Sequence, residues 1–451
     1  MLSHSPEESE RASVVLAHQV RERPAKGARG IDRLAEKWAA VASISGMKTD
    51  ISRTSAGPSL NAAAAATFVV FGVNGFVFAS WAARIPAVTE TLHLTSGQMG
   101  TLLLCTAIGS LLALPTAGLV VGRIGTANTV RAAGVLAALA GVGIALSLSA
   151  ESVAGTAVSL FFFGIGIGLW DVSQNIEGAD VEHKLRRTIM PQFHAAFSGG
   201  AFVGALIGAG LSTLGIGLPE HLLVIAAVVV VVALVTPRYF LPHEAQAAPL
   251  DGEPQAVKGP SPWRDSRTLL IGVVVLGATL TEGAGNDWIA KATVDGLGTS
   301  ESTGALMFAL FVLAMTAMRF FGGRVIDTYG RVAVLRASMG AAAAGLGLFV
   351  LAGNVWLAGF GAALWGVGAA LAFPMGMSAA ADDPKQAAAR VSVVSTVGYV
   401  AFLAGPPLLG YLGDLTGIHL ALLAILVPIV VALVLAGAAK PLVPVLPAAR
   451  D

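Results

Sequence analysis

Apolar runs of about 20 residues recur along this chain, and they constrain its fold more than any other feature. An α-helix needs about 20 apolar residues to cross the roughly 30 Å hydrocarbon core of a bilayer. Hydrophobic residues make up 55% of the 451 positions and charged residues only 12%, whereas soluble domains carry about 25% charged residues. We therefore expect an all-α integral membrane protein. The twelve predicted transmembrane helices are 62–84, 98–121, 130–149, 153–177, 189–215, 219–240, 268–290, 302–323, 332–352, 355–379, 390–412 and 417–439.

The basic residues predict how these helices are oriented. The connections after even-numbered helices hold many Lys and Arg residues, whereas the connections on the other side hold little more than Arg84 and Lys291. Cytoplasmic loops carry an excess of Lys and Arg, so we expect both termini in the cytoplasm and the chain in an inner (cell) membrane. The basic residues on the predicted cytoplasmic side include Arg123, Arg131, Arg186, Arg187, Arg267, Arg324 and Arg331.

The order of polar and apolar segments predicts the domain organisation. The expected parts are a polar cytoplasmic tail at 1–58, a six-helix bundle at 59–240, a Pro-, Ala- and Gly-rich cytoplasmic linker at 241–267, a second six-helix bundle at 268–440 and a cytoplasmic tail at 441–451. Such a linker composition is typical of flexible connections. Met47 is an alternative start, from which the chain has only a short polar leader.

The two predicted bundles resemble each other. Trp81 and Arg84 end the first span, and Trp288 and Lys291 end the seventh in the same spacing. A glycine-rich loop follows both the second and the eighth span, again about 205 positions apart. Repeated landmarks at nearly one offset indicate an internal duplication, and therefore two pseudo-symmetric bundles. Parallel six-helix halves are the arrangement of major facilitator transporters.

The loop after the eighth span resembles the loop signature of the major facilitator superfamily. Its key residues are Gly323, Asp327, Gly330 and Arg331, for which the resemblance implies a gating role. The segments 81–86, 169–182, 189–200 and 282–288 are similar to the fucose-permease-like branch of that superfamily, and the whole resemblance covers about residues 62 to 440. Characterised members of that branch import sugars with protons and use an acidic residue at the place of Asp171. The resemblance thus implies import of a sugar or sugar-like solute.

Asp171 is the main candidate for proton coupling. An ionisable group inside hydrocarbon is costly unless it faces a partner or a wet cavity, so it is a functional candidate by default. Asp171 lies on one polar face of the fourth span with Gln174 and Asn175, which we expect to contact solute. Reversible protonation of such a carboxyl would couple a proton gradient to solute movement. The alternative is a carboxylate fixed to a neighbouring helix.

Two other ionisable side chains are candidates for proton coupling. His194 is in the fifth span with Ser198 one turn further on, and Glu282 shares a face of the seventh span with Asn286. Ser198 and Asn286 are predicted solute contacts. A purely structural histidine that bonds across helices remains an alternative for His194.

Asp287 and Lys291 are spaced i, i+4 near the end of the seventh span. That spacing predicts a local ion pair without a role in transport.

Aromatic and polar residues of three spans complete the predicted solute site. They are Asn74, Phe78, Trp81 and Arg84 of the first span, Trp170 of the fourth and Tyr399 of the eleventh. An arginine would supply fixed donors, and an aromatic ring a stacking face. Because tryptophan is also common at membrane interfaces, an anchoring role for Trp81 is an equal alternative.

Together these features predict a secondary transporter that moves a small solute by alternating access, coupled to protons and functional as a monomer. The alternatives are a proton-coupled exporter of a drug or hydrophobic metabolite, and a non-transporting membrane sensor. The chain has one cysteine, no phosphate-binding loop motif and a net charge of +1. We therefore expect no cofactor, no metal site, no enzyme activity and no nucleic-acid partner.

Overall fold

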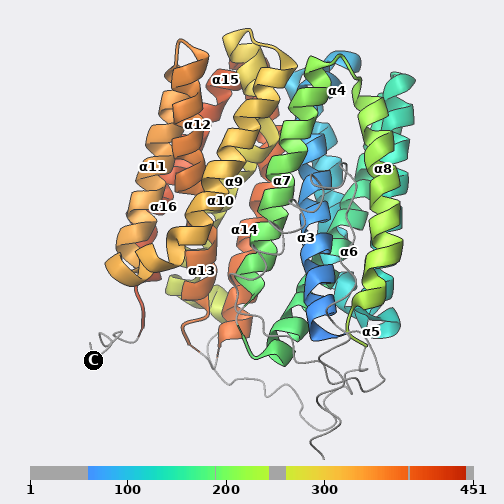
Figure 1. Cartoon of the computed structure of the whole chain (residues 1–451). Helices are drawn as coiled ribbons and strands as arrows, with labels where there is room; N and C mark the ends of the chain where they lie inside the picture. The colour runs from blue at the N-terminus through green and yellow to red at the C-terminus, as the bar shows by residue number, and fades with distance from the viewer. Residues whose placement is uncertain (1–58, 188, 243–260, 384–385, 443–451) are drawn as a thin grey trace, which may run out of the picture. The chain divides into compact units, whose positions relative to one another are not determined.

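The computed structural model describes residues 59–187, 189–242, 261–383 and 386–442, and these residues form helices joined by short connections (Figure 1). The first half comprises α3 (Leu60–Ala82), α4 (Ile85–Thr91), α5 (Ser96–Ser149), α6 (Val153–Leu185), α7 (Met190–Thr213), α8 (Leu218–Val235) and η1 (Thr236–Tyr239). The second half comprises η2 (Pro262–Arg264), α9 (Ser266–Leu297), α10 (Glu301–Tyr329), α11 (Arg331–Leu351), α12 (Val355–Ala369), α13 (Ala372–Ala380), α14 (Ala387–Thr416), α15 (Ile418–Ala421), η3 (Leu422–Ile425), α16 (Leu426–Leu435) and η4 (Ala436–Ala439).

Helix α5 accounts for two of the twelve predicted spans. Eleven segments among the described residues are long and apolar enough to cross a membrane, and one of them is the 54-residue α5. A straight helix of that length would extend about 80 Å, far more than one crossing needs. The backbone leaves helical geometry at Gly125, with φ 80° and ψ 163°, and this kink separates the two crossings. The all-α fold with twelve crossings is therefore confirmed.

Several predicted segments lie outside the described residues. These are the tail at 1–58 with the alternative start at Met47, the central part of the linker (243–260) and the C-terminal residues 443–451.

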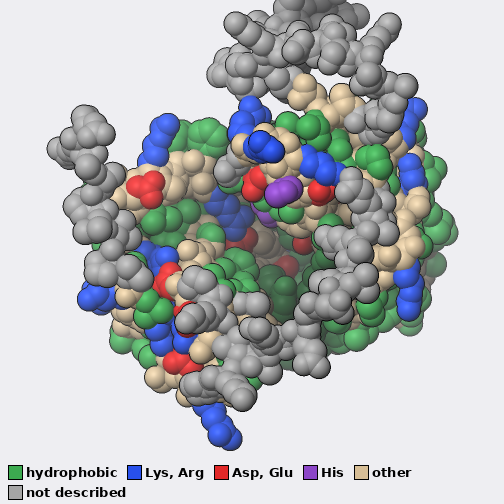
Figure 2. Space-filling view, turned by 90° about the horizontal axis from the view of Figure 1, so that it is seen from below, with side chains coloured by type: hydrophobic (Ala, Val, Ile, Leu, Met, Phe, Trp, Pro, Cys, Tyr) green, Lys and Arg blue, Asp and Glu red, His purple; other side chains and the backbone are tan. Residues whose placement is uncertain are grey.

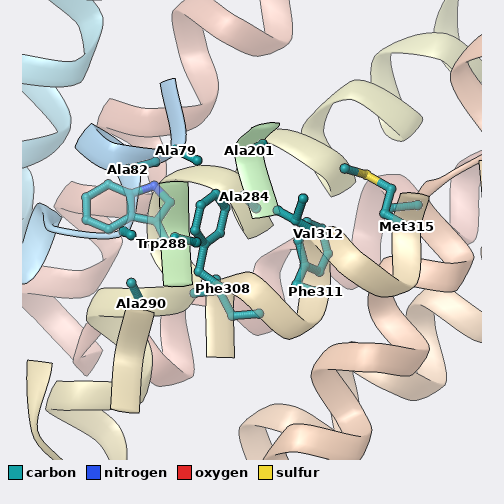
Figure 3. Packing of buried hydrophobic residues seen from close by; sticks show 14 of the residues in the cluster. Ala79, Ala82, Ala201, Ala284, Trp288, Ala290, Phe308, Phe311, Val312 and Met315 are labelled. Carbon is teal, nitrogen blue, oxygen red and sulfur yellow. The ribbon is translucent and has the colours of Figure 1, made fainter. Parts of the chain in front are cut away.

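Glycines allow helices of the first half to approach closely. A Cβ atom on Gly200 of α7 would lie 1.8 Å from the Gly72 carbonyl oxygen of α3, and one on Gly75 would lie 1.9 Å from the Phe197 carbonyl oxygen. Small residues at such crossings let the backbones of membrane helices gain dispersion contacts. The packed core continues through α9 and α10, where Figure 3 shows Trp288, Phe308 and Phe311 in one cluster with alanines of α3 and α7.

The halves are tied together at one end of the bundle, which we call the closed end. There Arg84 and Ser212 of the first half both donate to the Glu301 carboxylate of α10. Asp414 of α14 accepts from the Thr95 hydroxyl at 3.0 Å and from the Gly97 amide at 3.0 Å, and so caps the start of α5. In Figure 1 this end is at the top, with α4 and α15.

The opposite end, where Glu182 and Asp382 lie, we call the open end. Figure 2 views the molecule from this side and shows a hollow between the halves, with acidic and basic side chains inside it and hydrophobic walls around them. The polar contacts found here stay within each half: Glu182 accepts from the Ile189 and Met190 amides, and Asp382 binds Arg267 and Arg331.

Candidate functional site: a cavity between the halves

A cavity of about 470 Å³ lies between the two halves. Its volume is in the range of sites that hold small molecules. Residues of α3, α5, α6 and α7 form one wall, and residues of α9 and α14 form the other. The polar and aromatic residues along it are Asn74, Phe78, Trp81, Thr106, Ser110, Phe163, Asp171, Phe197, Glu282, Asn286, Asp287, Tyr399 and Phe402. Seven of the residues that the sequence predicted for the site therefore meet here, although they come from four spans.

Asp171 faces the cavity and is held by amides of its own helix. Gln174 Nε2 donates to Asp171 Oδ1 at 3.1 Å, and Asn175 Nδ2 lies 3.3 Å from the same oxygen. Asn175 Nδ2 also donates to the Asp171 backbone carbonyl at 2.7 Å. Among the described residues no Lys or Arg pairs with this carboxyl. Neutral donors orient the group without supplying a counter-charge.

Glu282 of α9 has a different partner. Arg319 Nη2 of α10 lies 2.8 Å from both carboxylate oxygens, and Arg319 Nε donates to the Ala370 carbonyl. Sequence analysis missed Arg319, although an arginine inside an apolar run was itself a signal. Glu282 therefore has a counter-charge beside it at the cavity wall.

Asp287 lines the cavity without a partner. The predicted Asp287–Lys291 pair is wrong, because Lys291 Nζ instead lies 2.7 Å from Asp295 Oδ2. Both carboxylates are four positions from Lys291, and α9 continues to Leu297, so Asp295 remains on the helix. No side chain among the described residues forms a hydrogen bond or ion pair with the Asp287 carboxylate.

Two further polar groups in the cavity wall lack partners. Asn74 is fully buried, and neither its Oδ1 nor its Nδ2 has a hydrogen-bond partner in the described part of the chain. The Thr106 hydroxyl is buried and unpaired as well. Buried polar groups are normally paired, so these atoms are available to a solute or to water.

The other predicted site residues lie away from the cavity lining. Arg84 binds Glu301 and the Ile216 carbonyl at the closed end. Trp170 is fully buried near Gly134 of α5. Gln174 and Asn175 contact the site through Asp171, as described above. His194 is exposed and makes an edge contact with the Phe71 ring, and Ser198 is buried in α7.

The predicted gating loop adopts the same conformation as its counterpart in the first half. Gly330 has φ 81° and ψ 152°, close to the values of Gly125, 205 positions earlier. The next residue in each half then binds a carboxylate: Arg331 donates to Asp382 at 3.0 Å, and Thr126 donates to Glu177 at 2.7 Å. These pairs are also 205 positions apart. Gly323 and Asp327, which were expected in the loop, are exposed residues of α10, since that helix continues to Tyr329.

Comparison with known proteins agrees with this architecture. The family model of the Major Facilitator Superfamily matches residues 278–450. An uncharacterised transporter of Sinorhizobium fredii is 32% identical over 371 residues, which cover 80% of this chain and 96% of the relative. An uncharacterised MFS-type transporter of Yersinia pestis is 30% identical and covers 79% of this chain and 90% of its own length. The chain belongs to the major facilitator superfamily.

As a member of this superfamily, the chain is a multi-pass membrane transporter of small solutes and not an enzyme. A solved structure of the nucleoside transporter NupG has the same fold, with a TM-score of 0.67, 13% identity and coverage of 83% of this chain and 98% of NupG. Within the described residues, no group of three or more His, Cys, Asp and Glu side chains is placed to hold a metal ion.

Proposed function

We propose that this superfamily member is a proton-coupled secondary transporter, in which solute binds in the cavity between the halves and Asp171 carries the proton. The observation that carries the proposal is the contrast inside one cavity: Glu282 is paired with Arg319, whereas Asp171 and Asp287 have no counter-charge among the described residues. Of these two, Asp171 is at the place where the branch resemblance implies an acidic proton carrier. A carboxyl without a fixed counter-charge can take up and release a proton as its surroundings change. A carboxylate bound to a guanidinium keeps its charge.

The arrangement of the two ends supports alternating access. Solute would enter or leave through the hollow at the open end, while Glu301 and Asp414 close the other end. For the opposite state, those contacts would break and the halves would approach at the open end. The ion pairs of Asp382 with Arg267 and Arg331 at the open end join residues of the second half only. They would therefore stay intact while the two halves move relative to each other.

We further propose that the open end faces the cytoplasm of a cell with the chain in its inner membrane. Arg186, Arg267 and Arg331 lie at the open end, and cytoplasmic loops are rich in basic residues. The cavity and the closed end are formed by a single chain, so the proposed working unit is a monomer. The branch resemblance, which implies uptake of a hydroxylated solute, gives the direction that we propose: solute and proton move inward together.

Labelling tests the orientation. Cys105 is replaced by Ser, and single cysteines are placed at Arg186 and at Ser300. In intact cells an impermeant thiol reagent is expected to label the cysteine at 300 and leave the one at 186 until the cells are opened. Labelling of the cysteine at 186 from outside would reverse the proposed orientation.

Transport in proteoliposomes tests the function itself. An imposed inward proton gradient should drive accumulation of a solute from a panel of sugars, sugar acids, amines and hydrophobic drugs, and a protonophore should abolish it. An internal dye should report acidification that depends on the same solute. Solute and proton moving in opposite directions would instead make the protein an exporter, and solute accumulation insensitive to the protonophore would contradict proton coupling.

A further inference from the structure

The cavity contains more negative charge than its fixed cation balances. Three carboxyl side chains lie along its walls: Asp171, Glu282 and Asp287. Arg319 neutralises one of them, Glu282. If Asp171 carries the proton, as proposed above, Asp287 remains as a carboxylate with no counter-charge among the described residues.

The charged form of such a carboxyl is costly in the membrane interior, so Asp287 either holds a proton or pairs with a cation that enters the cavity. A neutral solute would leave the charge unbalanced, and an anionic solute would be repelled by it. The preferred solute is therefore one that brings a positive charge to Asp287.

The remaining walls are complementary to an organic cation. Trp81, Tyr399 and Phe402 line the same cavity as Asp287. Aromatic faces attract ammonium groups and also cover the apolar body that carries them. The buried, unpaired Asn74 side chain supplies a free acceptor for an ammonium N–H and a free donor for a neighbouring oxygen.

We propose that the transported solute is an organic cation, a protonated primary amine whose ammonium group binds Asp287 and whose body packs against the aromatic walls. This inference rests on the proposed function and names the solute class for the same cavity. It assigns separate tasks to two carboxyls: Asp171 takes the proton, and Asp287 takes the solute.

The test compares amines with neutral analogues in which a hydroxyl or an acetylated amine replaces the ammonium group. The purified full-length protein is titrated with glucosamine, glucose and N-acetylglucosamine, and with 2-phenylethylamine and 2-phenylethanol, while its thermal unfolding is followed. A ligand that binds the folded protein raises the unfolding temperature. The amine of at least one pair should stabilise the protein at concentrations about tenfold below its neutral partner, which is the discrimination expected of a charged hydrogen bond.

The variant Asp287→Asn should remove this preference, because the amide keeps the shape of the side chain but not its charge. Asp295→Asn is the matched control, since it makes the same change two turns along α9 and outside the cavity lining. The control should retain the preference for the amine. If both variants lose the preference for the amine, or if Asp287→Asn keeps it, Asp287 is not the residue that binds the ammonium group.

Failure of this inference can be told apart from failure of the proposed function. Proton-coupled accumulation of glucose without any preference for amines would overturn the inference while the proposed function stands. Amine binding without proton coupling would support the inference and contradict the proposed function. Loss of solute-dependent proton movement in Asp287→Asn, with amine affinity unchanged, would make Asp287 a proton site and overturn its role as solute partner.

Discussion

At two places the halves of the molecule hold partly or fully buried carboxyl groups in different ways. In the first half, Asp171 is bound by the amides of Gln174 and Asn175, and in the second half Glu282 is bound by Arg319. The same difference recurs at the open end. Glu177 accepts from the Thr126 hydroxyl and the Leu241 amide, whereas its counterpart Asp382 binds Arg267 and Arg331.

This difference suggests a division of labour after the duplication. Neutral hydrogen bonds hold a carboxyl in place and leave its charge free to change, whereas a guanidinium fixes the charge. At these two places the second half would then keep a constant charge and the first half would respond to protons, with Asp287 as the cavity carboxyl of the second half that no guanidinium holds. Three variants test that contrast.

The largest effect is expected when Arg319 is replaced. Arg319→Met would leave Glu282 as an unpaired carboxylate at the cavity wall, so both folded-state stability and transport should fall, transport by roughly tenfold or more. The double variant Arg319→Met with Glu282→Gln removes both charges and should recover most of the stability. Unfolding temperature and counterflow measure the two effects. If Arg319→Met were as stable as the double variant, the unpaired Glu282 carboxylate would not lower the stability of the folded protein.

Asn175→Lys should give Asp171 of the first half a cationic partner, as Arg319 is for Glu282 in the second half. A lysine four positions after Asp171 can pair with it along α6 and hold it ionised. Gradient-driven accumulation of solute should be lost. Exchange of solute across the membrane should remain within a few-fold of the rate of the parent protein, since the substitution only adds an ion pair at Asp171. Asn175→Gln keeps an amide and is the control. Undiminished proton-coupled accumulation in the lysine variant would argue against a titrating Asp171.

Substitutions at the open end are expected to have the smallest effect on transport. They should differ in how much they lower the stability of the folded protein. Asp382→Asn leaves Arg267 and Arg331 without their charged acceptor and should lower the free energy of unfolding by about 2 kcal/mol. Glu177→Gln keeps an oxygen for the Leu241 amide, and its NH2 group can donate to the Thr126 hydroxyl, which can also accept. This substitution should therefore cost less than about 1 kcal/mol. Thermal unfolding of the two purified variants measures the difference. If both variants lost the same free energy of unfolding, the charged partners of Asp382 and the neutral partners of Glu177 would contribute equally to stability.

The fold follows from the sequence because each crossing is signalled locally. Apolar runs of sufficient length predict the helices, and the kink that divides α5 falls in the predicted loop at Gly125, although the helix resumes without the gap expected between 121 and 130. The full lengths of some helices were not predicted, because the predicted helices followed the apolar runs alone. Polar residues extend α6 to Leu185 and α9 to Leu297, beyond the predicted ends at 177 and 290.

The site was harder to predict because its partners are far apart in sequence. Glu282 and Arg319 are 37 positions apart and meet only when α9 packs against α10. Spacing alone could not choose between Asp287 and Asp295 as the partner of Lys291. Arg84 was expected on the first span with Asn74 and Trp81, yet α3 ends at Ala82, and Glu301 from the other half binds Arg84 at the closed end. Such choices depend on tertiary contacts that no local pattern encodes.

The most direct test of the central claim is Asp171→Asn. The amide keeps the size of the side chain and much of its hydrogen bonding, but it cannot titrate. Solute-dependent proton movement and counterflow are measured in the same proteoliposome preparation. Proton movement and gradient-driven accumulation should collapse while counterflow persists, because exchange requires only reorientation of the loaded carrier. Proton movement equal to that of the parent protein would contradict the account and exclude Asp171 as the proton carrier.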